Sequence, residues 1–268
     1  MDMLSAVILG LVQAFTEFLP VSSSGHLVLA QELLGVHVGH GAAFEVAVHF
    51  GTLLSVIVVY RTDVIRLSRV ALSALMRPHT VPARWGDADF RFVVAILVGC
   101  VPAGVVGLSF KNELESAFSS PQVVCVALMV TGVVLLATLR APSGHQPVSL
   151  GRGVLIGLAQ AVAIIPGISR SGSTISLAMF LRVDRAEAAR FSFLLSLPVI
   201  FGATLLKASD LLSAELSTVP WSQLAVGAVV SFLAGLAALL LLLRIVNRGG
   251  FAHFGWYCLL IGLIGLII

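Results

Sequence analysis

Long apolar runs with little charge are the feature that most constrains this chain. Five of them approach the length of about 20 apolar residues that a helix needs to cross a bilayer. A sixth run, at the C-terminal end, is slightly shorter but wholly apolar. The six predicted spans cover residues 44–60, 92–110, 123–139, 191–206, 224–243 and 254–268.

Composition leads to the same fold class. Of the 268 residues, 58% are hydrophobic and 11% are charged, whereas soluble domains carry about 25% charged residues. A water-soluble core of this size could not bury so much apolar surface. We therefore exclude a soluble globular protein, a disordered chain and a nucleic-acid-binding protein. We expect an all-α polytopic membrane protein that contacts membrane lipid and binds no nucleic acid.

Two further apolar stretches, residues 6–34 and 153–181, are broken near their middles. The breaks read Pro20-Val-Ser-Ser-Ser-Gly-His26 and Pro166-Gly-Ile-Ser-Arg-Ser-Gly-Ser173. Non-helical backbone at membrane depth is tolerated only where it packs in protein or lines a wet cavity. Each stretch therefore predicts a re-entrant hairpin of two half-helices. No signal-peptide pattern precedes the first stretch, so we expect it to belong to the fold.

The two broken stretches resemble each other and predict an internal repeat. Gly10-Leu-Val-Gln-Ala14 matches Gly157-Leu-Ala-Gln-Ala161, 147 positions further on. The same offset relates four further pairs of residues, Ser22 and Ser169, Ser24 and Ser171, Gly25 and Gly172, and Phe44 and Phe191. We expect one membrane domain, 1–268, built from repeat one at about 6–139 and repeat two at about 153–268.

Charge placement predicts the orientation. Thirteen of the 16 basic residues lie in four segments, 61–91, 140–152, 182–190 and 244–253, which we expect to be loops or turns. By the positive-inside rule these segments face the cytoplasm. The first hairpin then enters the membrane from outside and the second from inside. Such inverted repeats usually frame a site near the bilayer midplane.

Ionisable residues inside a membrane are costly and indicate function by default. Gln13 and Glu17 are four residues apart and share one face of a helix, where they could hold Mg²⁺ or Ca²⁺. Glu17 could instead take a proton or orient a histidine. A third alternative is an ion pair between Glu17 and Arg170 that only fixes the hairpins together.

The first break also offers a nucleophile and a base. Ser22, Ser23 and Ser24 carry hydroxyls, and a hydroxyl needs a neighbouring base to become a good nucleophile. His26 is close enough in sequence to act as that base or to protonate a leaving group. Serines in such loops also cap helices, so we expect one serine to cap the second half-helix while another does chemistry.

Arg170 is the most informative single residue. Its guanidinium offers a two-pronged donor that matches phosphate oxygens. Gly167 and Gly172 permit a tight turn, and the following helix N-terminus favours anions. The alternative is that Arg170 snorkels to the membrane interface. Arg170 is too far in sequence from the helix ends at the membrane surface to reach the interface easily. The second break therefore predicts a phosphate cradle.

Both motifs together resemble the two signatures of the undecaprenyl-pyrophosphate phosphatase family, also called the bacitracin-resistance protein family. They read Gln13-Ala-Phe-Thr-Glu-Phe-Leu-Pro-Val-Ser-Ser-Ser-Gly-His26 and Pro166-Gly-Ile-Ser-Arg-Ser-Gly172. The resemblance covers essentially the whole chain. The family's first motif starts more often with Glu, so Gln13 is a departure that leaves Glu17 as the main anionic group.

The resemblance implies a hydrolase of the bacterial cytoplasmic membrane that works on its outer face. It would remove the terminal phosphate from a C55 isoprenyl pyrophosphate, recycle the monophosphate carrier for cell-wall synthesis and confer bacitracin resistance. A divalent cation, Mg²⁺ or Ca²⁺, would assist, held by Gln13 and Glu17. The oligomeric state is left open between monomer and homodimer.

The predicted catalytic residues are Glu17, Ser23, His26 and Arg170. Ser23 would attack the terminal phosphorus, His26 would shuttle the proton, and Glu17 would orient His26 or hold the cation; a water nucleophile is the alternative. Arg170 would hold phosphate oxygens. The predicted substrate-binding residues are Ser22, Ser24, Gly25, Gly167, Ser169, Ser171, Gly172 and Ser173.

A secondary transporter or flippase for a phosphorylated lipid or another anion is the second hypothesis, because it shares the inverted-repeat architecture. The cluster of hydroxyl, imidazole, guanidinium and carboxylate groups exceeds what transport needs and favours catalysis. Glu45 and His49 are candidate supporting residues, with Glu45 preferred. Five other histidines are expected to be solvated in loops: His37, His40, His79, His145 and His253.

Overall fold

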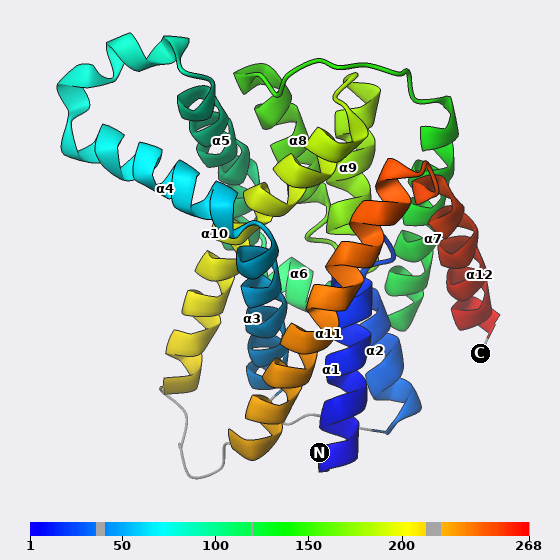
Figure 1. The fold of residues 1–268 in the computed structure, drawn as a ribbon. Helices are drawn as coiled ribbons and strands as arrows, with labels where there is room; N and C mark the ends of the chain where they lie inside the picture. Colours follow the sequence, from blue (N-terminus) through cyan, green and yellow to red (C-terminus); the bar gives the residue numbers. More distant parts are fainter. Residues whose placement is uncertain (36–40, 119, 213–220, 268) are drawn as a thin grey trace.

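A computed structural model describes residues 1–35, 41–118, 120–212 and 221–267. Within these ranges the chain is helical and has no strand, which confirms the all-α fold class (Figure 1). The α-helices are α1 (Met3–Phe18), α2 (Ser23–Leu33), α3 (Gly41–Val59), α4 (Arg61–Met76), α5 (Ala88–Ser109), α6 (Lys111–Phe118), α7 (Pro121–Ala137), α8 (Leu150–Val162), α9 (Arg170–Phe180), α10 (Arg185–Leu212), α11 (Trp221–Asn247) and α12 (Phe254–Ile267). His37 and His40 lie outside the described residues.

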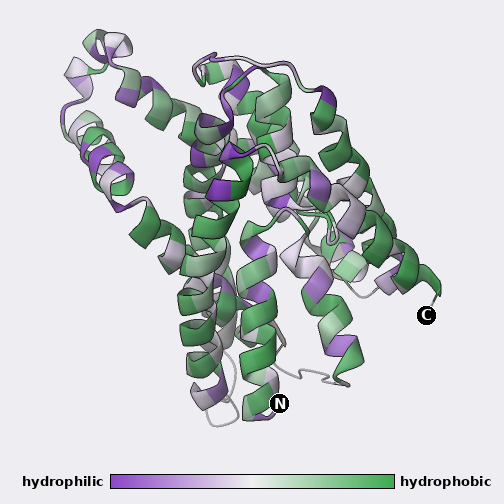
Figure 2. Cartoon of the chain, turned by 45° about the vertical axis from the view of Figure 1, so that its right-hand side comes forward, coloured by the Kyte–Doolittle hydropathy of each residue, from purple (hydrophilic) through white to green (hydrophobic). Residues whose placement is uncertain are grey.

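Four helices in the described part of the chain are long and apolar enough to cross a membrane: α5, α7 with the turn that follows it, α10 and α11. A fifth span results if α3 and α4, which meet at an angle of 88°, are counted as one. The predicted span 254–268 corresponds to α12, whose 14 residues extend about 21 Å. Most of the length of these helices consists of hydrophobic residues (Figure 2), so the chain is a polytopic membrane protein.

The segment 61–91 is not the loop that the charge pattern predicted. It contains α4 and two short 3-10 turns, Pro78–Thr80 and Pro82–Gly86. Arginines alternate with apolar residues along α4, and Leu72, Leu75 and Met76 are exposed. This is the pattern of a helix that lies in the membrane interface. Similarly, most of the predicted turn 182–190 is already helical, because α10 begins at Arg185.

The two broken stretches form helical hairpins that come from opposite ends of the molecule. α1 and α2 extend from the end at which the N-terminus lies, whereas α8 starts at the other end (Figure 1). We call residues 19–22 tip 1 and residues 163–169 tip 2. The hydroxyl of Ser171, just after tip 2, donates to the carbonyl oxygen of Phe18, just before tip 1, at 3.2 Å. The hairpins therefore meet inside the bundle.

Glycines let the first half-helix of each hairpin pack closely on a long helix of the other predicted repeat. A Cβ atom at Gly10 of α1 would lie 3.0 Å from the carbonyl oxygen of Gly227 in α11. A Cβ atom at Gly157 of α8 would collide with the carbonyl group of Gly99 in α5. Contacts of this kind are common where membrane helices approach through small residues. Each hairpin thus packs on a helix of the other predicted repeat, which fits an inverted repeat. The repeat boundaries 6–139 and 153–268 stay a prediction.

Candidate active site

The two tips repeat the same capping hydrogen bonds. Ser22 caps α2 by accepting from the backbone N–H of Gly25 at 3.3 Å, and Ser169 caps α9 by accepting from Gly172 at 3.0 Å. A second hydroxyl, two residues after each capping serine, lies 3.3 Å from the capping hydroxyl: Ser24 in α2 and Ser171 in α9. Each of these residues in the first hairpin lies 147 positions before its counterpart in the second hairpin. The capping role expected for one serine therefore belongs to Ser22.

Tip 2 is fixed from outside the hairpin by α7. The hydroxyl of Thr131 donates to the carbonyl oxygen of Gly167 and accepts from the backbone N–H of Ser169, both at 3.0 Å. Gly167 has a φ of 95°, and a Cβ atom there would collide with the carbonyl oxygen of Val124. Only glycine fits both the backbone angle and the space. The sequence patterns gave no sign of Thr131, because its partners lie 36 and 38 residues away.

Glu17 is the centre of the site. Its Oε1 accepts from Nη2 of Arg170 at 2.6 Å, and its Oε2 accepts from the hydroxyl of Ser23 at 2.6 Å. Gln13 donates from Nε2 to the same Oε2 at 3.1 Å. The Glu17 side chain is 8% exposed and that of Arg170 is 16% exposed. The structure thus brings four predicted residues together, and the ion pair between the hairpins that one alternative foresaw is present.

His49 also faces this carboxylate. Its Nε2 lies 3.6 Å from Oε2 of Glu17, while its Nδ1 lies 2.8 Å from the carbonyl oxygen of Glu45. Because a carbonyl only accepts, Nδ1 carries a proton and Nε2 is the nitrogen presented to Glu17. Of the two candidate supporting residues in α3, His49 lies beside the Glu17 carboxylate, and the supporting role expected for Glu45 stays a prediction.

His26 lies elsewhere than predicted. Its Nδ1 is 2.8 Å from the carbonyl oxygen of Ser22, and its Nε2 is 2.8 Å from the hydroxyl of Tyr257 in α12. The two rings also stack, with centroids 5.6 Å apart and planes within 9°. Both ring nitrogens are thus engaged away from Glu17, and the predicted orientation of His26 by Glu17 is wrong in this state. The base that touches Ser23 is Glu17.

Tyr257 was missed because nothing in the sequence links an aromatic residue in the last apolar run to the first break, 231 residues earlier. Its neighbour Cys258 makes a second contact with tip 1, from Sγ to the carbonyl oxygen of Pro20 at 3.7 Å. A tyrosine in a membrane helix has a common alternative role at the lipid–water interface. Only the fold shows that this one meets His26.

Two polar atoms of the site are buried without a hydrogen-bond partner: Nη1 of Arg170 and Oε1 of Gln13. Buried polar groups are normally paired, so each is a position at which a ligand atom would be stabilised. The Arg170 guanidinium also lies over the ring of Phe193, 5.9 Å from its centroid. Arg170 therefore keeps one donor for an anion, and Gln13 keeps one oxygen for a donor or a cation.

The remaining predicted substrate-binding residues line the two helix starts. Gly25 and Gly172 supply the N–H groups that the capping serines accept. Ser173 lies in the first turn of α9, where its backbone N–H donates to the carbonyl oxygen of Ser169 at 2.8 Å. The described residues contain no group of three or more His, Cys, Asp or Glu side chains placed to hold a metal. A cation here would need oxygens from another source.

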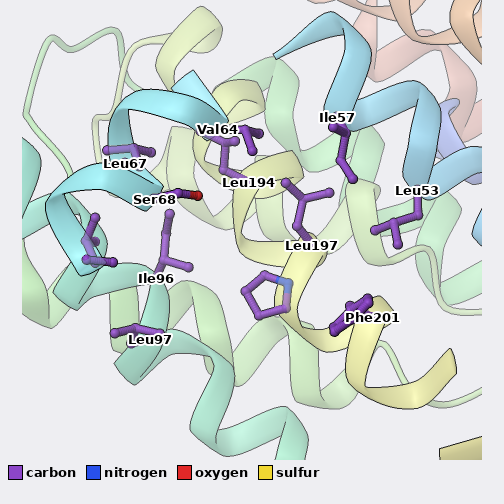
Figure 3. A pocket seen from close by; sticks show the side chains of 13 residues that line it. Leu53, Ile57, Val64, Leu67, Ser68, Ile96, Leu97, Leu194, Leu197 and Phe201 are labelled. Carbon is purple, nitrogen blue, oxygen red and sulfur yellow. The ribbon is translucent and has the colours of Figure 1, made fainter. Parts of the chain in front are cut away.

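An apolar cavity of about 320 Å³ opens between α3, α4, α5 and α10. Its side chains include Leu194 and Leu197, next along α10 from Phe193, and the one hydroxyl of Ser68 (Figure 3). It contains none of the charged groups around Glu17. The cavity suits an apolar chain and does not take part in the polar site.

Comparison with known proteins gives a consistent result. A family model described as bacitracin resistance protein BacA matches residues 6–264. A protein of Salinibacter ruber named undecaprenyl-diphosphatase is 44% identical, with 97% of each chain covered. A protein of the same name from Desulfosudis oleivorans is 42% identical, covering 98% of this chain and 97% of its own. Undecaprenyl-diphosphatase 1 of Bacillus cereus is 37% identical over the same shares.

Proposed function

Because the chain belongs to the bacitracin resistance protein BacA family, we propose that it hydrolyses undecaprenyl pyrophosphate to undecaprenyl phosphate and inorganic phosphate. The product is the lipid carrier that cell-wall synthesis reuses, and its recycling confers bacitracin resistance. One observation carries the proposal at the level of chemistry. A partly buried arginine, whose Nη1 is unpaired among the described residues, and the hydroxyl of a serine bind the same carboxylate.

The terminal phosphate of the substrate binds to Arg170 and to the start of α9. A guanidinium binds phosphate through two parallel hydrogen bonds, and Nη1 is already unpaired. The N-terminal turn of a helix adds N–H groups and the positive end of its dipole. When phosphate oxygens take over Arg170, the carboxylate of Glu17 loses its strongest partner and becomes a better base for Ser23.

Ser23 then attacks the terminal phosphorus. The Oγ–P bond forms, the bond from that phosphorus to the bridging oxygen breaks, and the proton of Ser23 passes to Glu17. Undecaprenyl phosphate leaves with the bridging oxygen. In the second step water attacks the phosphoserine, the Oγ–P bond breaks and Glu17 returns its proton to Ser23. The hydroxyl of the water stays on the phosphate, and its second proton goes to solvent.

A divalent cation, Mg²⁺ or Ca²⁺, fits this site only as a companion of the substrate. Glu17 offers one carboxylate, and Oε1 of Gln13 is a buried oxygen without a partner. Mg²⁺ is commonly held by one or two carboxylates together with substrate phosphates. Gln13 and Glu17 would hold the ion together with the pyrophosphate, and its charge would offset that of the phosphate oxygens.

We place the protein in the bacterial cytoplasmic membrane, with its site open to the outer face. The support is the asymmetry of charge. Three of the basic segments lie at one end of the molecule (Figure 1): α4, residues 140–152 and the junction of α11 with α12. The positive-inside rule assigns that end to the cytoplasm, and the hairpin that carries Glu17 and Ser23 enters from the other end.

Phosphate release from undecaprenyl pyrophosphate by the purified protein in detergent tests the function. Arg170→Ala is expected to lower kcat by about 10²- to 10³-fold, as loss of one key transition-state donor does. Arg170→Lys should retain only part of the wild-type kcat, because lysine keeps the positive charge but lacks the two parallel donors of the guanidinium. Arg152→Ala is the matched control, since among the described residues the Arg152 side chain hydrogen-bonds only to exposed oxygens of Pro147 and Gln146.

Removal of Arg170 also leaves the Glu17 carboxylate buried without its cation, so membrane insertion and Tm are measured for each variant. A wild-type protein that moves the monophosphate lipid across liposomes but releases no phosphate would contradict the proposal and favour the flippase. A fully active, correctly inserted Arg170→Ala variant would remove its chemical basis.

A further inference from the structure

We infer that Tyr257 is a positioning residue, which fixes the orientation of His26 and pairs with its Nε2 lone pair by donating its hydroxyl to Nε2. The inference rests on the proposed function and adds a residue to the site, on the helix farthest from it in sequence. The distance from Nε2 to the Tyr257 oxygen is 2.8 Å, which is typical of a well-formed hydrogen bond.

The direction of the hydrogen bonds follows from the acceptors. The carbonyl oxygen of Ser22 can only accept, so Nδ1 of His26 carries the proton of that contact. In the neutral imidazole Nε2 then holds the lone pair, and the phenol is the donor to it. A histidine tautomer is set by the partner of its other nitrogen: here the Ser22 carbonyl sets it, and the phenol, which can donate or accept, pairs with the Nε2 lone pair that results.

Stacking of the Tyr257 ring also fixes the plane of the His26 imidazole ring. The two rings lie 5.6 Å apart and within 9° of parallel. A stacked neighbour and two hydrogen bonds leave the His26 ring little freedom about its χ angles. Tyr257 is 42% exposed, so the contact that restrains His26 lies at the periphery of the protein.

His26 is well placed for the lipid-linked end of the substrate. Ser23 and His26 are three residues apart at the start of α2, a spacing that puts them on the same side of the helix. Ser23 points to Glu17, whereas His26 contacts α12. A pyrophosphate whose terminal phosphorus lies at Ser23 extends its second phosphate along this side. Tyr257 would therefore act through His26 on the phosphate that remains on the lipid.

The same contacts hold tip 1. Nδ1 of His26 and Sγ of Cys258 bind the carbonyl oxygens of Ser22 and Pro20, respectively. Ser22 has a φ of 69°, a left-handed conformation that costs energy for a residue with a side chain. Two consecutive residues of α12 thus reach tip 1, one directly and one through the His26 ring, next to the strained residue that precedes Ser23.

The protonation form can be measured without activity. Solid-state NMR of protein labelled with ¹⁵N-histidine in liposomes, with His26 assigned by its loss in His26→Gln, should show His26 protonated on Nδ1 with a hydrogen-bonded Nε2. Tyr257→Phe keeps the ring and removes only the hydroxyl, so the Nε2 resonance should move toward that of a free imine nitrogen. A wild-type His26 protonated on Nε2, or an unchanged resonance in the variant, would overturn the inference.

Kinetics test whether Tyr257 acts through His26. Tyr257→Phe should lower kcat for phosphate release about 3- to 10-fold, the equivalent of one lost neutral hydrogen bond, while Tm stays unchanged. In a His26→Gln background the same change should have no further effect, since residues that act as a unit are not additive. Trp256→Phe, at the exposed neighbouring position, is the matched control.

Additive losses, or a Tyr257→Phe enzyme with wild-type kcat, would contradict the positioning role while leaving the proposed function intact. If the wild-type protein released no phosphate, the proposed function would be wrong, and Tyr257 and His26 would have no role in catalysis. The NMR experiment would still show whether Tyr257 donates a hydrogen bond to Nε2 of His26.

Discussion

Positions 23 and 170 are equivalent in the two predicted repeats but carry different side chains. Both follow the capping serine of their half-helix, and both donate to the carboxylate of Glu17, Ser23 to Oε2 and Arg170 to Oε1. The position equivalent to Glu17 is Ile164, which has no charge. The scaffold is therefore duplicated while the chemistry is divided: the first hairpin supplies acid and hydroxyl, and the second supplies the cation.

Ser23 is the proposed nucleophile, and its substitution tests that role. Ser23→Ala should abolish phosphoserine formation and lower kcat by at least about 10²-fold, because the attacking oxygen is lost. Ser23→Thr, which keeps a hydroxyl, should retain part of the activity. The measurement is an acid quench during turnover of substrate labelled with ³²P in its terminal phosphate, followed by peptide mapping.

A water nucleophile gives the opposite pattern in that experiment. Wild-type protein would carry no label, and Ser23→Ala would keep near-native turnover. Ser143→Ala, in the exposed segment between α7 and α8, is the control for handling and expression.

The sequence was sufficient to find the residues whose presence in a membrane needs explaining. Glu17 and Arg170 stand out because a buried charge costs several kcal/mol unless it is paired, and their pairing follows from the two breaks. His49 stood out only as one of two candidate supporting residues and Tyr257 not at all, since their contacts come from helices whose rotation and depth only the fold defines. His26 was assigned to the wrong partner for the same reason: nearness to Ser23 in sequence says nothing about α12.

At the scale of elements, broken helices were predictable and amphipathic ones were not. Proline, serine and glycine within an apolar stretch predict a break wherever the helix lies. In α4, by contrast, the arginines led us to expect a cytoplasmic loop, although they belong to the polar side of an amphipathic helix. The structure shows what those charges do: Arg66 bridges to Asp89 of α5 at 2.9 Å, and Asp63 accepts from Arg190 of α10 at 2.9 Å. These pairs hold α4 at its 88° angle to α3.

The element-scale prediction tests the close packing of α8 on α5. A Cβ atom at Gly157 would collide with the backbone of Gly99, so Gly157→Ala must push the helices apart, at a cost of about 1–3 kcal/mol. Because α8 leads into tip 2, phosphate release should fall together with Tm.

Gly104→Ala, on α5 with no atom within 4 Å of the new Cβ, is the matched control. Its Tm should stay the same or rise, since alanine favours helix over glycine. Equal stability of the two variants would show that the contact at Gly157 is unimportant.

At the scale of the whole molecule, the two ends differ in charge, and this difference predicts the direction in which the site opens. Ser143 is exposed in the segment at the basic end, and Ser116 is exposed in α6, between the spans α5 and α7, in a connection that lacks the arginines of the other end. Charge bias in short connections determines membrane orientation. Ser116 is therefore expected outside and Ser143 in the cytoplasm.

Cysteine labelling checks this arrangement directly. A membrane-impermeant maleimide added to intact spheroplasts should label Ser116→Cys, whereas Ser143→Cys should react only after permeabilisation. The wild-type chain is the background control, because Cys125 and Cys258 are buried and Cys100 is partly buried. If Ser143→Cys reacted first, the hairpin that carries Glu17 would enter from the cytoplasm, and the outer-face site would have to be abandoned. With the expected pattern, the end at which α1 and α2 enter faces outward, where a carrier lipid released by wall synthesis arrives with its pyrophosphate.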